Sequence, residues 1–129
     1  MALVNLARDI IADALIGGGT YTLFDNANAA LGVGDSSTAY AAAQTDLQAA
    51  TNKLRKAMDA TYPQRAANVL TLRSTFLTTD ANFTWAEWGT FNNVTLRAGQ
   101  MLQRIVSALG AKTSAASWQL TVTLTFVLV

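Results

Sequence analysis

The end of the chain carries the most regular pattern of polar and apolar positions. From Ser117 to Val129 the two kinds of residue alternate with a period of two, and none of them is charged. This pattern predicts a long β-strand with one apolar face. An uncharged strand at a sheet edge pairs readily with another chain, so we expect it to be buried or paired with a partner. The candidate interface residues on its apolar face are Trp118, Leu124, Phe126 and Leu128.

A different period marks the start of the chain. Between Met1 and Ile16, apolar residues recur at spacings of three and four, which predicts an amphipathic helix. The glycines at positions 17–19 should end this helix and form a flexible joint. Two interpretations of the apolar stripe remain open: the helix packs on its own sheet, or it docks on a neighbouring subunit. The candidate interface residues of the stripe are Leu3, Leu6 and Ile10.

Between these two ends, short period-two segments alternate with turn residues. They predict strands at 20–24, 29–33, 53–59, 69–77, 83–91, 101–108 and 118–129. The Ala- and Gln-rich segment 37–52 is interpreted as a loop with a short helical turn. The fold class expected is α+β and mainly β: an antiparallel β-sandwich of about seven strands with an N-terminal amphipathic helix. In this organisation residues 1–19 form the helix and hinge, and residues 20–129 form the sandwich domain.

Composition narrows the possible chemistry. The 129 residues include no histidine and no cysteine, which removes the commonest general base and the commonest metal ligands. We therefore expect no enzymatic activity, no catalytic residues, no cofactor and no metal. A net charge of +1 gives no reason to expect specific nucleic-acid binding. No apolar run is long enough for a membrane-spanning helix, and Arg8, Asp9 and Asp13 interrupt the region where a signal peptide would be apolar.

The low content of charged residues bears on association. Charged residues make up 13 % of the chain, against roughly 25 % in ordinary domains. Few charges suit a subunit whose surface is covered by neighbours, and we expect a closed homotrimer. The alternative is a compact monomer rich in alanine and threonine.

Three local motifs could carry chemistry. Glu87 is predicted to share a strand face with Phe83, Trp85, Gly89 and Phe91, where burial would require a cation such as Arg73 or Arg104. A structural glutamate in an ion pair is favoured over the acid of a glycosidase. A glycosidase needs a second carboxylate nearby, and the sequence does not indicate one. Residues 32–35 (Gly-Val-Gly-Asp) are interpreted as a turn rather than a phosphate loop. The basic run 53–56 is interpreted as solvated charge rather than a polyanion site, since a strand would divide it between two faces.

The order of several motifs resembles that of small virion proteins of tailed bacteriophages. The motifs are Leu31 to Ala39, Gln44 to Leu47, Lys53 to Lys56, Trp85 to Phe91, Met101 to Arg104 and Leu109 to Thr113. The resemblance covers about Val4 to Phe126. The same skeleton is similar to the head-proximal domain of tail-collar fibres.

This resemblance implies a non-enzymatic, surface-attached and commonly trimeric structural protein of the virion. Because the sequence ends after its last predicted strand, we expect a capsid decoration (cement) protein that stabilises the head by bridging capsomers. The alternative is a tail-fibre, baseplate or other tail structural protein involved in host attachment. The partners expected are further copies of the chain and the major capsid protein or tail proteins of the same virion, assembled in the host bacterial cytoplasm.

Overall fold

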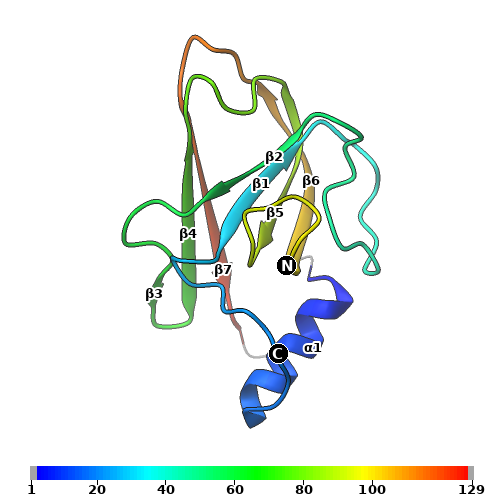
Figure 1. Ribbon diagram of the computed structural model, residues 1–129, viewed down its shortest axis with the longest axis vertical. Helices are drawn as coiled ribbons and strands as arrows, with labels where there is room; N and C mark the ends of the chain where they lie inside the picture. The colour runs from blue at the N-terminus through cyan, green and yellow to red at the C-terminus, as the bar shows by residue number, and fades with distance from the viewer. Residues whose placement is uncertain (1–2, 128–129) are drawn as a thin grey trace.

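The computed structural model describes residues 3–127 as one helix and two antiparallel sheets (Figure 1). The elements are α1 (Asn5–Ile16), β1 (Ala30–Gly34), β2 (Lys53–Ala57), β3 (Gln64–Ala66), β4 (Val69–Phe76), β5 (Thr84–Phe91), β6 (Met101–Ala111) and β7 (Trp118–Thr125). One sheet has the strand order β2-β1-β5-β6 and the other has the order β3-β4-β7. The mainly β sandwich with an N-terminal helix is thus confirmed.

The inner faces of the two sheets enclose an apolar core. Leu31 and Leu72 are buried in its larger part. In a smaller part Trp85 contacts Phe76 and Trp118 edge-on, with ring centroids 4.8 and 5.1 Å apart. Edge-to-face contacts of this kind add to the stabilisation that burial of the rings already provides. Strand β4 lies against β1 and β2, so β7 falls on the side of the sandwich where β6 ends the other sheet.

Helix α1 forms over the predicted segment and lies at one end of the long axis (Figure 1). Gly17 ends it in the left-handed conformation, with φ of 66°, and the N–H of Gly18 bonds to the carbonyl of Asp13. This is the glycine cap expected at a helix C-terminus. Ala7 and Ile10 are buried, and the Val4 N–H bonds to the Leu102 carbonyl of β6. The first turns of the helix therefore pack on the chain's own sheet, which is one of the two interpretations of the apolar stripe.

One predicted strand is absent and one strand was not predicted. Residues 20–24 form no strand, although threonine alternates with Tyr21 and Leu23 there. The segment crosses from the helix to β1 without a neighbouring strand, and alternation alone does not supply the hydrogen-bonding partner that a strand needs. The sequence gives no apolar signal for β3, whose three residues are all exposed and which exists because it pairs with β4.

Strand β7 confirms most of the alternation predicted for the end of the chain. Val122 and Leu124 are buried while Thr121 and Thr123 are exposed. The strand ends at Thr125, earlier than predicted, and the Phe126 side chain is 50 % exposed. Leu128 lies outside the described residues.

Candidate assembly interface

Glu87 and Arg104 form an ion pair on the outer face of the four-stranded sheet. Arg104 Nε donates to Glu87 Oε2 at 2.5 Å, and both side chains are fully buried. This confirms that Glu87 is a buried carboxylate paired with one of the two predicted cations. Such a pair survives burial only where further hydrogen bonds satisfy the remaining atoms.

Those further hydrogen bonds come from the loop between β1 and β2. The backbone N–H groups of Gln48 and Ala49 donate to the two carboxylate oxygens of Glu87, at 2.9 and 2.8 Å. Arg104 in turn donates to the Thr38 carbonyl at 2.9 Å and to Gln44 Oε1 at 3.1 Å. The ion pair therefore holds the loop 35–52 against the sheet. Its geometry is that of a structural pair, with every charged oxygen and each terminal guanidinium nitrogen occupied.

The motif 32–35 explains how the loop approaches so closely. Gly32 and Gly34 lie in β1, so the predicted turn is wrong. A Cβ on Gly32 would come within 2.8 Å of the Phe91 ring and 3.0 Å of Leu47. A Cβ on Gly34 would overlap Glu87 Oε1. These glycines leave the space that the loop and the buried carboxylate occupy, which is a packing role rather than a phosphate-binding one.

Trp85 does not share a face with Glu87, contrary to the sequence prediction. The pairing of β5 with β6 is irregular between Trp85 and Glu87. Trp85 consequently packs between the sheets against Phe76, while Glu87 faces the loop. A bulge of this kind redirects side chains and breaks the alternation on which the prediction rested.

The basic run in β2 is divided between two faces, as predicted, but its central residue is not solvated. Arg55 is buried, stacks 3.7 Å above the Phe91 ring and pairs with Asp46 at 3.0 Å. Its Nη1 also donates to the carbonyls of Asn93, Thr95 and Ala98. The interpretation as solvated charge is therefore wrong for Arg55, whose guanidinium holds the loop 92–100.

Two further cations hold the turn that follows β4. Lys56 Nζ lies 2.6 Å from Asp80 Oδ2, and the Leu77 N–H donates to the same oxygen. The hydrogen bond from Lys56, followed by that from Leu77, lowers the pKa of Asp80 below its usual 3.8. Lys112 is buried and donates to the Leu77 carbonyl and to Asn82 Oδ1.

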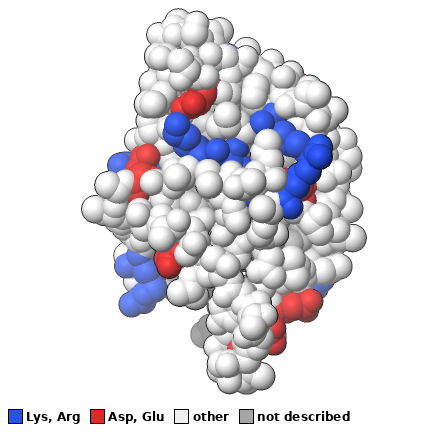
Figure 2. Space-filling view, viewed as in Figure 1, with Lys and Arg blue, Asp and Glu red and all other residues white. Residues whose placement is uncertain are grey.

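Internal pairing leaves large areas of the surface without charge. In Figure 2 most of the visible face is neither blue nor red, and the charged atoms gather in a band across its upper half, at its left edge below that band and on the lower lobe. Within residues 3–127 no group of three or more carboxylates could hold a metal ion. No helix in this part of the chain is long and apolar enough to cross a membrane.

The sandwich is open along the side where β6 and β7 end their sheets. Strand β7 pairs with β4 along its whole length, and β6 pairs with β5. A short bridge between Leu3 and Gln103 covers the start of β6, and nothing else in the described residues pairs with either outer edge. From Ile105 to Ala111 and from Trp118 to Thr125 the sequence has no charged residue and no proline. Both edges thus lack charged residues and proline, two of the usual features that prevent strand pairing between chains.

A groove lies between these two edges. It has a volume of about 340 Å³ and is lined by Trp88, Gln103, Ile105, Thr123, Leu124 and Thr125. Because residues of β6 and of β7 line the same space, the two edges face the same side of the molecule. We call this region, strand β7 with the facing part of β6 and the groove between them, the open seam.

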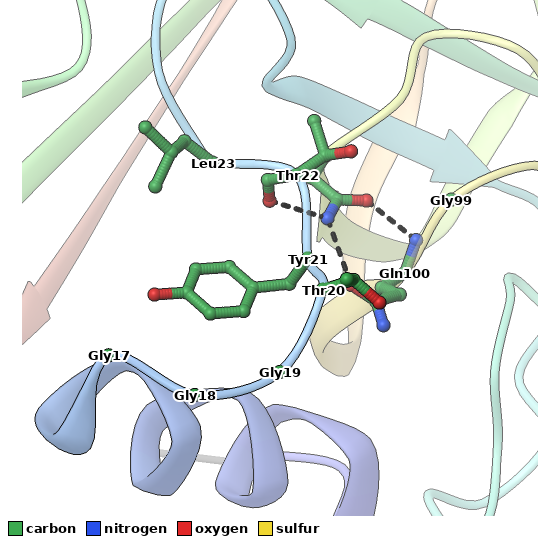
Figure 3. Close-up of a pocket in the computed structure, with 10 residues that line it drawn as sticks. Gly17, Gly18, Gly19, Thr20, Tyr21, Thr22, Leu23, Gly99 and Gln100 are labelled. Carbon is green, nitrogen blue, oxygen red and sulfur yellow. Dashed lines mark hydrogen bonds between the residues drawn. The ribbon is translucent and has the colours of Figure 1, made fainter.

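A larger cavity lies elsewhere, beside the end of helix α1. Its volume is about 650 Å³, and residues 17–23 line it together with Asn92, Gly99 and Gln100 (Figure 3). Figure 3 shows the Tyr21 and Leu23 side chains directed away from Gln100. The Asn92 side chain is engaged with the Thr22 carbonyl and with Gln100. No charged side chain lines the cavity.

The candidate interface residues from the sequence fall into two groups. Leu3, Leu6, Ile10, Trp118 and Leu124 are buried or partly buried inside the chain, whereas Phe126 is half exposed. Sequence reasoning did not select Leu15 and Ile16, each 83 % exposed at the end of α1, or Val127 beside Phe126. Their apolar character was visible in the sequence, but their exposure depends on which face of the helix the sheet covers. Whether any of these residues contacts another subunit stays a prediction.

Comparison with known proteins adds no relationship. No protein-family model matches the chain, and neither a curated protein nor a solved structure matches it.

Proposed function

We propose that this protein is a non-enzymatic structural subunit of a bacteriophage virion, and that it acts as a capsid decoration protein. The observation that carries the proposal is the open seam: the edge of β7 and the facing part of the β6 edge, both without charge or proline and without a neighbouring strand beyond the bridge at Gln103. A strand edge of this kind favours association with other chains.

The internal use of the buried ionisable groups also supports a structural role. Glu87, Arg104, Arg55 and Lys112 each have several hydrogen-bonding partners that hold loops in place. Side chains so engaged are poorly suited to exchange protons with a substrate. The motif order resembles that of tailed-phage virion proteins, and this resemblance is the reason for proposing a phage virion as the assembly. The same motif skeleton is also similar to the head-proximal domain of tail-collar fibres, which favours a tail protein as the second candidate.

Mass action explains how such a subunit would act. A protein that binds only the assembled shell stabilises that shell, by about 2.7 kcal/mol per site when its free concentration is one hundred times its Kd. Contacts to several capsomers at once strengthen weak binding through a high effective concentration. Neither effect requires a cofactor or a catalytic side chain.

The test is to locate the protein on purified virions of the phage that encodes it. Antibodies raised against the recombinant chain should label heads in immunogold micrographs, and pre-absorption with the chain should abolish the label. Labelling of tails alone would select the second candidate. Absence of the chain from virions, by both mass spectrometry and labelling, would refute both.

A thermal assay tests decoration separately. Particles lacking the protein should release their genome at a lower temperature than complete particles, and added purified chain should restore the difference. Bovine serum albumin at equal concentration serves as the control. If both kinds of particle release the genome at the same temperature, the protein does not stabilise the head.

A further inference from the structure

Strand β7 has the properties of a strand that pairs with itself. Every second residue of an edge strand directs its N–H and C=O groups away from the sheet, and for β7 no described residue accepts or supplies these hydrogen bonds. What satisfies a row of alternating donors and acceptors best is another extended strand. The chemistry of the edge therefore selects a β-strand as its partner rather than a helix or a small molecule.

A comparison with β6 shows why β7 is the better of the two edges. The pairing of β6 with β5 is irregular near its middle, and Gly110 in β6 has φ of 109°. Irregularities of this kind bend and twist an edge away from a partner. Strand β7 instead keeps an unbroken register with β4 from Trp118 to Thr125. It contains no glycine, so it offers eight regular residues.

The side chains of β7 suit a second copy of the same strand. The exposed face presents Gln119, Thr121, Thr123 and Thr125, all neutral. In an antiparallel pair of identical strands, a charge close to the two-fold axis would lie near the same charge of the second copy, and this face carries none. Threonine pairs across strands also contribute favourable contacts. Self-pairing therefore meets no electrostatic opposition.

From these observations we propose that β7 pairs antiparallel with β7 of a second copy around a two-fold axis and joins the two three-stranded sheets into one. This proposal rests on the proposed structural role and names a contact by which the subunit associates. Such a contact is isologous, since the same strand serves on both sides. It would close over the groove between β6 and β7, because that groove opens beside the β7 edge.

The position of Phe126 selects the register. Phe126 continues the strand beyond β4, and its backbone N–H bonds to the Asn68 carbonyl. Its ring is half exposed, while Trp118 at the other end of the strand is only partly buried. With Val122 on the two-fold axis, Phe126 of one copy lies opposite Trp118 of the other, and Thr121 lies opposite Thr123. The register thus covers an exposed aromatic ring with an aromatic partner.

Disulfide cross-linking tests the contact directly, because the chain has no cysteine of its own. Thr121→Cys and Thr123→Cys proteins are prepared separately, mixed in their reduced forms and then oxidised with glutathione. The mixture should give at least fivefold more cross-linked dimer than either variant alone, since position 121 faces position 123 of the second copy. Thr45→Cys, at an exposed loop position, is the control and should give only the background level.

Sedimentation supplies the second readout. The wild-type chain should sediment as a dimer at micromolar concentration, and Thr121→Lys/Thr123→Lys should shift it to a monomer that keeps the far-UV circular dichroism spectrum of the folded chain. A wild-type monomer up to about 100 μM would overturn the pairing. So would an oligomer, including the predicted trimer, in which the mixed cysteine variants do not cross-link. Neither result affects the location of the protein on the virion, so failure of this contact is distinguishable from failure of the proposed function.

Discussion

The outer face of the four-stranded sheet and the open seam are built from opposite kinds of residue. On the outer face, Glu87, Arg104 and Arg55 are buried beneath loops, and each makes several hydrogen bonds. In the open seam, β7 has no charged residue, and its outer edge meets no other part of the described chain. The buried charges of this protein thus hold its own loops.

This difference separates folding from association. Loops on the outer face lack the backbone pairing of a sheet, so hydrogen bonds to buried charged side chains fix them in place. The seam is regular secondary structure and needs no such support. An uncharged surface remains there because the charges that would normally protect an edge are elsewhere. We therefore expect substitutions on the outer face to affect stability, and substitutions at the exposed positions of the seam to affect association.

The largest effect should come from breaking the buried ion pair. Glu87→Ala removes the acceptor of two loop N–H groups and leaves Arg104 charged and buried, at a cost of roughly 3–5 kcal/mol in the free energy of unfolding. Urea denaturation of the wild type and the variant measures this cost. The double variant Glu87→Ala/Arg104→Met should recover part of the loss, because no unpaired charge remains. Equal unfolding midpoints for wild type and Glu87→Ala would show that the pair does not hold the loop.

A smaller effect distinguishes the two faces of β7. Leu124→Ala removes a buried side chain from the core and should lower the free energy of unfolding by about 3 kcal/mol. The neighbouring Thr123→Ala changes an exposed side chain and should alter it by no more than about 0.5 kcal/mol. Thermal melts of the two variants at the same low protein concentration, checked by sedimentation, give the comparison. Similar losses for both would mean that the face assigned to Thr123 is not exposed.

The same contrast explains how far the sequence predicts the structure. Regular patterns are local, so the alternation of β7 and the spacing in α1 identify those elements correctly. The burial of Glu87 with Arg104 was also predictable, since a carboxylate among apolar strand residues needs a cation. By contrast, the segment 20–24 has the right alternation but no strand beside it, and only the tertiary fold decides that.

What the sequence could not supply are contacts between distant segments. Arg55 looks like part of a solvated basic run, and its role becomes visible only when the loop 92–100 is placed around it. Gly32 and Gly34 resemble a turn, whereas their lack of side chains serves a loop that arrives later in the chain. The open seam was predicted only in part. The uncharged sequence of β7 predicted a strand edge that pairs readily, but the sequence could not show that this edge lies beside the edge of β6, because that depends on the order of strands in two sheets.

The smallest expected effect concerns pH and the turn after β4. Because the pKa of Asp80 in the folded protein lies below its usual 3.8, its ionised form stabilises the fold above that pH. The stabilisation should disappear as the pH falls through the lowered pKa, where the folded protein must also bind the proton. Thermal melts from neutral pH to about pH 2 should therefore show a gap between wild type and Asp80→Asn that narrows below pH 3.8. Lys56→Met removes the main cause of the lowered pKa. The difference in melting temperature between Lys56→Met and Lys56→Met/Asp80→Asn at neutral pH should therefore be smaller than that between wild type and Asp80→Asn, while association through the seam is unchanged. A gap between wild type and Asp80→Asn that stays constant across the range would show that the Lys56 hydrogen bond does not stabilise the ionised carboxylate.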